Sequence, residues 1–399
     1  MSTPSILVSG ASIAGPAVAS WLATAGWAVT VVERFDRLRD EGQNVDLRGT
    51  GREIVRRMGL EDAARSHHTS ETGTAFVDED GRAYATWPTG TEDTRSVSSP
   101  TAELEILRGQ LARLLYDHSA GSAEYLFGDQ IRALHDDGRG VDVEFAHGPR
   151  RRFDAVVIAE GSRSRTRDLV FPDSRIDELG FFAAYTTIPR TADDDRQWRI
   201  HMAGRGRLVH LRPDNVGSTR AMLSLQSDVR GLDRLDRAGV VAVLRATYGD
   251  AGWETPRILA ALDDAPLYVD QIVQVRIPIW HRGRVAVLGD AAWCAGPFGT
   301  GTTNAITGAY VLAGELGATP EDIPAAFARY ERILRPSTDR ALAFVPRGGH
   351  PRTARGRSLL RAMLRVMGSP VGKALYRIPA PPVTTVALPD YPMRAAARS

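Results

Sequence analysis

The chain has 399 residues, with 50 basic and 48 acidic side chains and a formal net charge of +2 at pH 7. This balance excludes a strong general attraction to nucleic acid or anionic membranes and favours a small-molecule partner. The single cysteine, Cys294, excludes an internal disulfide and a site built from several thiolates. No signal-peptide pattern and no apolar run of membrane-spanning length is found, so we expect a soluble cytoplasmic protein.

Residues 5–34, SILVSGASIAGPAVASWLATAGWAVTVVER, form the first recognisable unit. The apolar run over 5–9 predicts a buried strand, and the β-branched run over 29–32 predicts a second one. A helix that ends at Gly26 is expected between them. Strand, turn, helix and strand in this order are typical of a nucleotide-binding unit.

The turn of this unit carries three small residues, Gly10, Ser12 and Gly15. Small side chains let the backbone approach a pyrophosphate, toward which the following helix points its N–H groups and its positive dipole end. Glu33 closes the second strand, where a carboxylate can bind both hydroxyls of an adenosine ribose. Because a carboxylate repels a 2′-phosphate, the pattern favours tightly bound FAD or NAD over NADP.

The next predicted elements follow in chain order. Residues 51–66 have helical spacing, and residues 74–87 predict a hairpin with Asp80-Gly81 at its turn. Residues 108–118 predict a helix with its leucines on one face. Three β-like runs then predict one compact sheet, with strands near 125–127, 131–135 and 141–145.

A second buried strand is expected to end at Ala159. Between 181 and 275, several short β-like runs and a helix near 240–248 predict an antiparallel sheet lobe inserted into the nucleotide domain. The chain then returns through a buried strand, RVAVLGDAAW, and a long helix, NAITGAYVLAGEL. Alternating strands and helices at both ends of the chain predict an α/β fold with a doubly wound parallel sheet.

The segment RSLLRAMLRVMG at 357–368 predicts an amphipathic C-terminal helix with arginines opposite its apolar face. That face comprises Leu359, Leu360, Met363, Leu364 and Met367. A basic amphipathic helix can bind a membrane. Packing across a domain junction with solvated arginines is the commoner outcome and the one we expect.

Three separated stretches occur in one order: GASIAG…VVER, AEGSRSRTR and GDAAWCAGPFGTGTTNAI. Together they resemble the single-component FAD-dependent aromatic hydroxylases, the group A flavoprotein monooxygenases of the para-hydroxybenzoate hydroxylase type. The likeness covers most of the chain. The VDLRG stretch and the short C-terminal region look most like the tetracycline-modifying and antibiotic-tailoring branch of that group.

The resemblance implies a discontinuous Rossmann-like FAD-binding domain, a substrate-binding sheet lobe and a C-terminal helical segment. The FAD-binding domain would comprise residues 1–72, 100–175 and 276–345. The lobe would comprise residues 73–99 and 176–275, and the helical segment residues 346–399.

The resemblance also implies which residues bind the cofactor. The ADP half of FAD would be held by Gly10, Ser12, Ile13, Ala14, Gly15, Glu33 and Arg34. The flavin side, the middle motif and the late motif would contribute Arg48, Arg108, Glu160, Gly161, Gly289, Asp290, Gly301 and Thr302. Pro297, Phe298 and Gly299 would form the loop beside the flavin ring and are the candidates nearest the chemistry.

The sequence departs from the family pattern at three places. Glu160 stands where the family has Asp, a residue that the family associates with both FAD and NAD(P)H. The longer side chain weakens the case for the pyridine-nucleotide role more than the case for the FAD role. Trp293 stands where the family usually has His, and the PFGTG loop is one residue shorter than the common pattern. These departures concern residues that the family associates with the nucleotide and the flavin ring.

The implied activity is monooxygenation. NADPH or NADH would reduce FAD, and O2 would then form a C4a-hydroperoxyflavin that hydroxylates or epoxidises a hydrophobic aromatic or polyketide-like molecule. Substrate contacts are expected from the sheet lobe, with Tyr185, His201, His210 and Met222 as candidates, although each could instead pack in the sheet core. No metal site is expected, and the protein would be a monomer or a homodimer.

Two other functions fit the same residues. A dehydrogenase or redox-neutral flavoprotein would keep the flavin without oxygen transfer, which the departures at Glu160, Trp293 and the PFGTG loop favour. A non-catalytic protein that binds an antibiotic would need no turnover. Bound FAD, its reaction with oxygen and its turnover distinguish the three.

Overall fold

The structure is a computed structural model that describes residues 3–39, 42–90, 96–97, 99–227, 231–296, 301–343, 350–375, 378–379 and 386–392. Three loop candidates from the sequence, Pro297, Phe298 and Gly299, lie outside these residues. No helix in the described ranges is long and apolar enough to cross a membrane.

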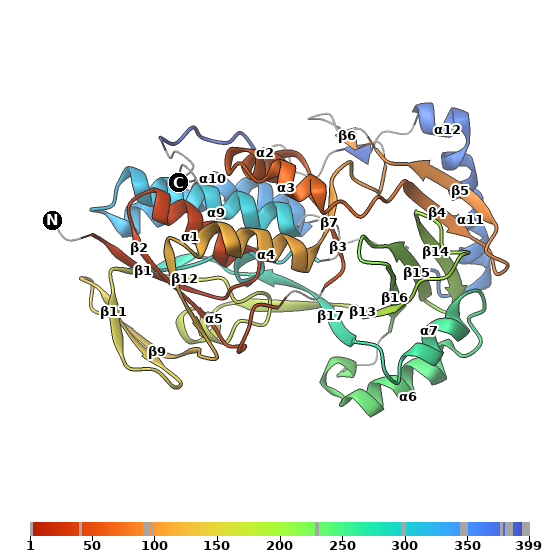
Figure 1. The fold of residues 1–399 in the computed structure, drawn as a ribbon, viewed down its shortest axis with the longest axis horizontal. Coiled ribbons are helices and arrows are strands. Elements are labelled where there is room, and N and C mark those ends of the chain that lie inside the picture. Colours follow the sequence, from red (N-terminus) through yellow and green to blue (C-terminus); the bar gives the residue numbers. More distant parts are fainter. Residues whose placement is uncertain are drawn as a thin grey trace.

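A six-stranded sheet organises one half of the molecule (Figure 1). In spatial order its strands are β18 (His281–Arg282), β19 (Val285–Val287), β12 (Ala155–Ile158), β1 (Ser5–Ser9), β2 (Ala28–Glu33) and β8 (Ala123–Phe127). All neighbouring pairs are parallel except β18 with β19. The central strands β1 and β12 are almost entirely buried, which explains why they are continuous apolar runs in the sequence.

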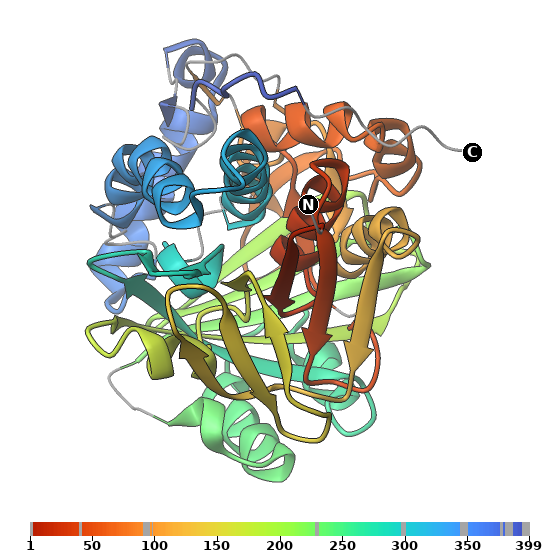
Figure 2. The same ribbon diagram turned by 90° about the vertical axis from the view of Figure 1, so that its left-hand side faces the viewer.

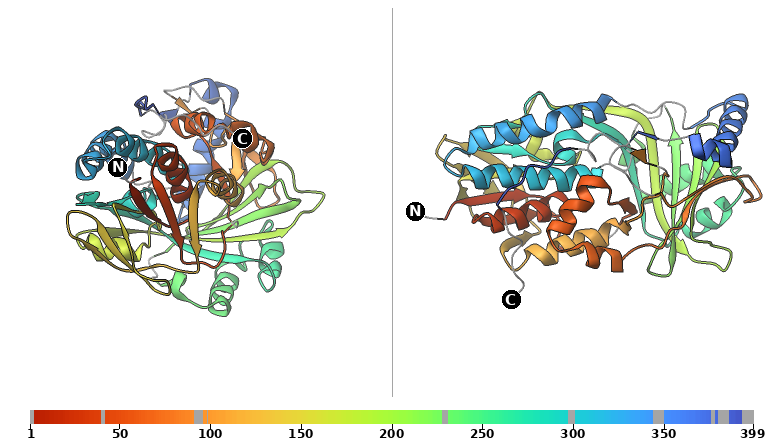
Figure 3. Two further views of the ribbon diagram at one scale, coloured as in Figure 1. Left: turned by 60° about the vertical axis from the view of Figure 1, so that its left-hand side comes forward. Right: turned by 90° about the horizontal axis from the view of Figure 1, so that it is seen from above.

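Helices cover one face of this sheet, and a small sheet covers the other (Figure 2). The helices are α1 (Ala14–Thr24), α2 (Gly49–Arg57), α3 (Glu61–Ser66), α4 (Arg108–Ser119), α9 (Gly301–Ala318) and α10 (Ile323–Ala343). The small antiparallel sheet comprises β9 (Ile131–Asp136), β10 (Val141–Phe145) and β11 (Arg151–Phe153), with α5 (Arg165–Val170) next to β9. Seen from above, α9 and α10 lie side by side along this half of the molecule (Figure 3).

The compact sheet predicted for residues 125–145 is wrong in one strand. β8 does not join β9 and β10 but pairs in parallel with β2. Tyr125 on β8 packs edge to face against Tyr116 on α4 at 4.7 Å, and its hydroxyl lies 2.6 Å from Ser119 Oγ. These contacts with the preceding helix direct β8 to the edge of the parallel sheet, as in a strand–helix–strand unit.

A seven-stranded sheet forms the second half. Its strands, in spatial order, are β17 (Leu267–Arg276), β13 (Arg175–Pro189), β16 (Ser218–Gln226), β15 (Arg207–Pro213), β14 (Gln197–Gly204), β4 (Gly73–Val77) and β5 (Ala83–Pro88). The predicted hairpin at 74–87 is confirmed as β4 and β5. All neighbouring pairs are antiparallel except β14 with β4.

The two faces of the seven-stranded sheet have different neighbours. Helices α6 (Arg237–Tyr248) and α7 (Thr255–Ala261) pack on one face, which we call the helix-covered face, against Ala184, Val209 and Leu223. The opposite face, which we call the inner face, carries the alternate side chains. At its distal edge, α11 (Ala354–Gly368) packs on it next to β5 and β14.

Helix α11 has two apolar stripes rather than one apolar face. Leu364 is buried against Trp87 and Met202, and Leu360 and Met367 pack beside it. Leu359 and Met363, which the sequence placed on the same face, are 74% and 49% exposed. Successive residues are about 100° apart on a helix, so the sheet contacts only one of the two adjacent stripes.

Short elements complete the fold. They are β3 (Asn44–Asp46) paired with β7 (Glu105–Leu107), β6 (Ser96–Val97) paired with β20 (Ile378–Pro379), the helices α8 (Asp290–Trp293) and α12 (Pro370–Leu375), and the 3-10 turn Leu232–Arg234. Asn44 Nδ2 on β3 donates to Pro213 O on β15 at 3.1 Å. This bond connects the two halves at the end of the seven-stranded sheet.

Residues 386–392 pack on α9. The Tyr391 hydroxyl donates to Glu315 Oε1 at 2.7 Å, and the Tyr310 hydroxyl donates to Pro389 O at 3.0 Å. The ring of Tyr391 occupies the space that a side chain at Gly314 would fill, because a Cβ there would lie 2.1 Å from Tyr391 Cδ2. A glycine in the middle of α9 therefore makes room for this C-terminal segment.

Replacing Gly314 with Ala is expected to destabilise the protein by about 1–3 kcal/mol, because overpacking displaces a well-packed neighbour. Alanine is otherwise the better helix former by about 1 kcal/mol, so a loss would measure the clash with Tyr391. Urea unfolding followed by circular dichroism measures it. In a Tyr391→Ala background the same glycine substitution should be neutral or stabilising, and equal losses in both backgrounds would contradict the packing.

Candidate functional site

The turn after β1 brings two stretches of backbone into direct contact. Gly10 has a φ of +108°, and a Cβ there would lie 2.5 Å from Ala159 O at the end of β12. A Cβ at Gly15 would lie 1.8 Å from Gly10 O. Both positions therefore require glycine, and the turn closes tightly before α1 with the helix N-terminus directed out of the sheet.

Glu33 is fixed at the end of β2 by two backbone donors. Its Oε2 accepts from Ala11 N at 2.8 Å, and its Oε1 accepts from Phe35 N at 3.1 Å. Each carboxylate oxygen can accept a second hydrogen bond. The carboxylate is therefore oriented beside the glycine turn, where it can receive the two hydroxyls of a ribose.

Three helices begin at the same place beside this turn. Gly289, before α8, has a φ of +65°, and a Cβ there would lie 3.2 Å from Ala14 Cβ on α1 and 3.7 Å from Ala305 Cβ on α9. A Cβ at Gly301, the first residue of α9, would lie 3.6 Å from Asp290 Oδ1. The N-termini of α1 and α9 thus converge, and their partial positive charges favour an anionic group between them.

Arg108 connects the turn to α8. Its Nη2 donates to Ser12 Oγ at 2.6 Å. Burial raises the pKa of Asp290 above its ordinary value, and the positive charge of Arg108 opposes that rise. Ser12, Arg108 and Asp290, which are far apart in the sequence, therefore lie around one space. We call the groups lining this space, from Gly10 to Gly15 with Glu33, Arg108, Gly289 and Asp290, the cradle.

Other predicted cofactor residues lie at the edge of the cradle or outside it. Arg48 precedes α2 and is almost fully buried, with its guanidinium bonded to Asp46 at 3.0 Å and to Pro100 O at 2.7 Å. Arg34 is exposed, and its guanidinium lies 4.8 Å from the centre of the Phe35 ring. Thr302 is half-buried in the first turn of α9. Ile13 and Ala14 are buried around the start of α1.

The carboxylate of Glu160 is bonded within the fold. It accepts hydrogen bonds from Ser9 Oγ at 2.5 Å, Ser164 Oγ at 2.7 Å and Thr166 Oγ1 at 2.6 Å. Thr166 N donates to it as well, at 3.2 Å. These bonds join the ends of β1 and β12 to the start of α5. Gly161 follows with a φ of +83° and starts the turn toward Ser164, the N-cap of α5.

Trp293 also serves packing. Its ring lies 4.3 Å from that of Trp280 and 5.9 Å from that of Tyr330, and all three side chains are fully buried. Trp293 therefore points into the core between α8 and α10, where an imidazole would leave a gap. The side of α8 that carries Asp290 is the one that faces the cradle.

Aromatic and polar side chains form one row across the inner face of the seven-stranded sheet. Tyr268 on β17 is opposite Tyr185 on β13, Tyr185 is opposite Met222 on β16, and Met222 is opposite His210 on β15. Residues directly opposite in neighbouring strands share a face. Three of the four substrate candidates thus belong to this row, which the sequence could not show because it depends on strand register.

The row begins next to the cradle. Tyr268, which the sequence did not single out, stacks on Tyr185 with ring centres 6.2 Å apart, and the guanidinium of Arg39 lies 5.9 Å from its ring centre. Burial raises the pKa of Tyr268, and the positive charge of Arg108 opposes that rise. The guanidinium of Arg39 also lies 4.8 Å from the ring centre of Phe35, whose N–H bonds Glu33, so Arg39 connects the first member of the row to the cradle.

His201 lies on the helix-covered face instead. Its Nδ1 is 3.2 Å from Val77 O, its Nε2 is 3.1 Å from Ala251 O, and its ring packs against Trp253. Burial lowers the pKa of His201. The ring joins β4 to the connection between α6 and α7, so this candidate is separated from the row by the sheet itself.

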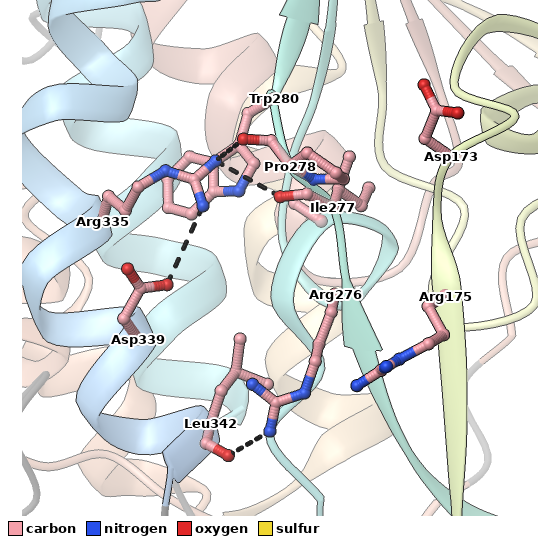
Figure 4. A pocket seen from close by; sticks show the side chains of 10 residues that line it. Asp173, Arg175, Arg276, Ile277, Pro278, Trp280, Arg335, Asp339 and Leu342 are labelled. Carbon is pink, nitrogen blue, oxygen red and sulfur yellow. Dashed lines mark hydrogen bonds and ion pairs between the residues drawn. The ribbon is translucent and has the colours of Figure 1, made fainter.

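A cavity of about 320 Å³ lies on the other side of α8 (Figure 4). It is lined by Asp173, Arg175, Arg276, Ile277, Pro278, Trp280, Ala292, Arg335, Asp339 and Leu342. Arg335 stacks 4.6 Å from the Trp280 ring centre and donates to Pro278 O, and Arg276 donates to Asp177 at 3.1 Å. These arginines bind protein groups, which indicates a junction between α10 and the long strands rather than part of the cradle.

A family model described as "FAD binding domain" matches residues 3–322. The flavin-dependent monooxygenase eupH of Phoma sp is 38% identical over 369 residues, covering 84% of this chain and 84% of the relative. An uncharacterized protein of Mycobacterium tuberculosis is 39% identical over 331 residues, covering 82% of this chain and 88% of the relative. The solved structure of tetracycline destructase Tet(55) has a TM-score of 0.79 and 29% identity, covering 98% of this chain and 99% of that chain.

The chemistry of the cradle suits FAD. Two converging helix N-termini can take the pyrophosphate, and the carboxylate of Glu33 can take the adenosine ribose. Asp290 offers a buried carboxylate for hydroxyls of the ribityl chain. No group of three or more His, Cys, Asp or Glu side chains in the described part of the chain is placed to hold a metal ion.

Asp290→Ala is expected to lower the amount of FAD that copurifies with the protein, because it removes the buried carboxylate that faces Arg108. The ratio of flavin to protein absorbance measures occupancy. Asp339→Ala is the matched control, because Asp339 lines the cavity on the opposite side of α8. Full retention of flavin in Asp290→Ala, or equal loss in both variants, would contradict the position of the cofactor.

Glu160→Gln is expected to reduce stability by about 1–3 kcal/mol, because buried hydroxyl donors lose a charged acceptor. The KM for the pyridine nucleotide should not change, since the carboxylate is bonded within the fold. Thermal unfolding and steady-state kinetics of the FAD-loaded protein measure the two effects. Glu79→Gln, at an exposed position, is the control. A raised KM with unchanged stability would assign the residue to the nucleotide instead.

Proposed function

This chain belongs to the FAD-binding-domain family and is a flavin-dependent monooxygenase, and on that basis we propose its substrate class and its co-substrates. The substrate is a hydrophobic aromatic or polyketide-like molecule, which is hydroxylated or epoxidised. O2 supplies the oxygen atom, and NADPH or NADH supplies the electrons. When bound, FAD supplies the electron transfer and the oxygen activation that protein side chains cannot.

The observation that carries this proposal is the row Tyr268–Tyr185–Met222–His210 on the inner face next to the cradle. Two stacked tyrosine rings and a thioether offer a flat, polarisable surface, which suits a planar ring system. His210 adds a polar group at the far end of the row. The resemblance to a tetracycline destructase supports a polycyclic substrate.

The chain's own residues perform the binding and positioning. The helix N-termini and Glu33 hold the cofactor at its charged end. The row then forms the surface, or floor, on which a substrate ring can lie, and Tyr268 and Arg39 connect that floor to the cradle.

The first experiment is to load the purified protein with FAD and to screen planar phenols and polycyclic phenolic ketones for stimulated NADH or NADPH oxidation. Mass spectrometry of products formed under ¹⁸O2 is expected to show one added ¹⁸O atom. If every compound that stimulates oxidation consumes O2 without giving an oxygenated product, the proposed oxygen transfer is contradicted. That outcome would favour a dehydrogenase or an oxidase.

Tyr185→Ala is expected to lower kcat/KM at least tenfold while FAD occupancy is retained, because it removes half of the stacked pair under the substrate. Steady-state kinetics with the compound identified in the screen measures this. Tyr248→Phe is the matched control, since Tyr248 is a buried tyrosine on the helix-covered side of the same sheet. Equal kcat/KM values in the wild type and in Tyr185→Ala would contradict the proposal that the inner face binds the substrate.

A further inference from the structure

Four polar side chains on the inner face form one continuous hydrogen-bond chain. Trp198 Nε1 on β14 donates to His210 Nδ1 at 3.2 Å. His210 Nε2 lies 3.3 Å from Ser224 Oγ on β16, and Ser224 Oγ lies 2.8 Å from His350 Nε2. His210 and Ser224 are buried, and His350 belongs to the segment that leads into α11.

The chain has a fixed direction, because an indole N–H can only donate. His210 Nδ1 must accept from Trp198, so the hydrogen of the neutral imidazole lies on Nε2 and points to Ser224. The Ser224 hydroxyl has one hydrogen to donate, and its oxygen lies 2.8 Å from His350 Nε2. When that hydrogen is donated to Nε2, the hydrogen of the neutral His350 ring lies on Nδ1.

Other contacts hold the first member of the chain in place. The guanidinium of Arg212 lies 4.3 Å from the ring centre of Trp198 and bonds to Glu71 at 2.9 Å. Glu105 also contacts Arg212, and both carboxylates are fully buried. A cation that is itself held by buried ion pairs therefore lies against the indole ring and favours its observed orientation.

His350, the last member of this hydrogen-bond chain, lies beside the proposed substrate floor. Ser224 is two residues from Met222 on β16, so both side chains lie on the inner face. The His350 ring is 4.9 Å from that of Phe181 and is only half-buried. Among the described residues, no group forms a hydrogen bond with His350 Nδ1.

We propose that this series of hydrogen bonds makes His350 a fixed hydrogen-bond donor. The donor positions the substrate through an acceptor oxygen, such as the carbonyl of an aromatic ketone. The inference rests on the proposed function and narrows its substrate class. A substrate with an acceptor oxygen at this point gains the bond, and one that offers only a hydrocarbon group or an N–H donor there does not. His350 is thus a positioning and specificity residue, not a base.

Charge does not disturb this arrangement near neutral pH. Burial lowers the pKa of His210 to about 3, and the neighbouring His350 adds to that effect. Burial lowers the pKa of His350 to about 4. Both imidazoles are therefore neutral from mildly acidic to alkaline pH, which the directional argument requires.

The first test is ¹⁵N NMR of the FAD-loaded protein labelled only at histidine, recorded from pH 6 to 8.5. His210 is expected as the Nε2–H tautomer and His350 as the Nδ1–H tautomer throughout. Ser224→Ala should mix the tautomers of His350, and Ser224→Thr, which keeps the hydroxyl, should restore them. His201, on the opposite face, is the internal reference and should not respond. His210 in the Nδ1–H form, or a His350 signal indifferent to Ser224→Ala, would overturn the proposal.

The second test uses two compounds of matched shape, 1-acetylnaphthalene and 1-ethylnaphthalene, titrated into the oxidised holoprotein and followed by the flavin spectrum. Ser224→Ala should weaken binding of the ketone about three- to tenfold, as expected for one hydrogen bond, and leave the hydrocarbon unchanged. Equal effects on both compounds would overturn the donor role. If neither compound binds, the aromatic substrate class of the proposed function fails. The tautomers measured by NMR then decide by themselves whether His350 Nδ1 is a donor.

Discussion

The backbone contact between Gly10 and Ala159 is the constraint on which the cofactor cradle depends. β1 and β12 are neighbours in the parallel sheet, and Ala159 N donates to Ser9 O at 2.7 Å where both strands end. Gly10 N donates to Val32 O at 2.7 Å, so the end of β2 joins the same corner. A side chain at Gly10 would separate these strand ends and displace Glu33, the start of α1 and the Ser12–Arg108 bond together.

Glu160 stabilises the polar side of that corner, which explains its departure from the family's aspartate. Its side chain is longer by one C–C bond, about 1.5 Å, and reaches Ser9 on β1 while still bonding Ser164 and Thr166 ahead of α5. Four donors satisfy one carboxylate here. The charge that the resemblance assigns to a nucleotide is used to close the sheet, in the same way that Trp293 fills the core in place of an imidazole.

The local sequence pattern was sufficient to predict most helices and strands. The candidate substrate site could not be predicted, because it depends on the register between strands. The unit from β1 to β2, the hairpin β4–β5 and helix α4 were predictable because their apolar spacing and turn residues lie within short stretches. The sequence could not show which face of the sheet His201 and His210 lie on, because this depends on where the β14–β15 hairpin turns. His201 is opposite Val209, whereas His210 is opposite Ile200, so the two histidines point to opposite faces. Tyr268 was missed for the same reason.

The long strands β13 and β17 extend from one half of the molecule to the other (Figure 1). They are paired by backbone hydrogen bonds, and Val275 of β17 also packs in the core of the first half. β17 carries Tyr268 near one end, and near the other Val275 N donates to Cys294 O at 2.9 Å and Gln274 Nε2 donates to Ala295 O at 3.2 Å, just after α8. Asp290 begins α8, so one strand sets the position of the substrate floor relative to the cradle. Substitutions on the inner face can therefore change the proposed substrate floor without moving the cradle, since the two are built from different elements.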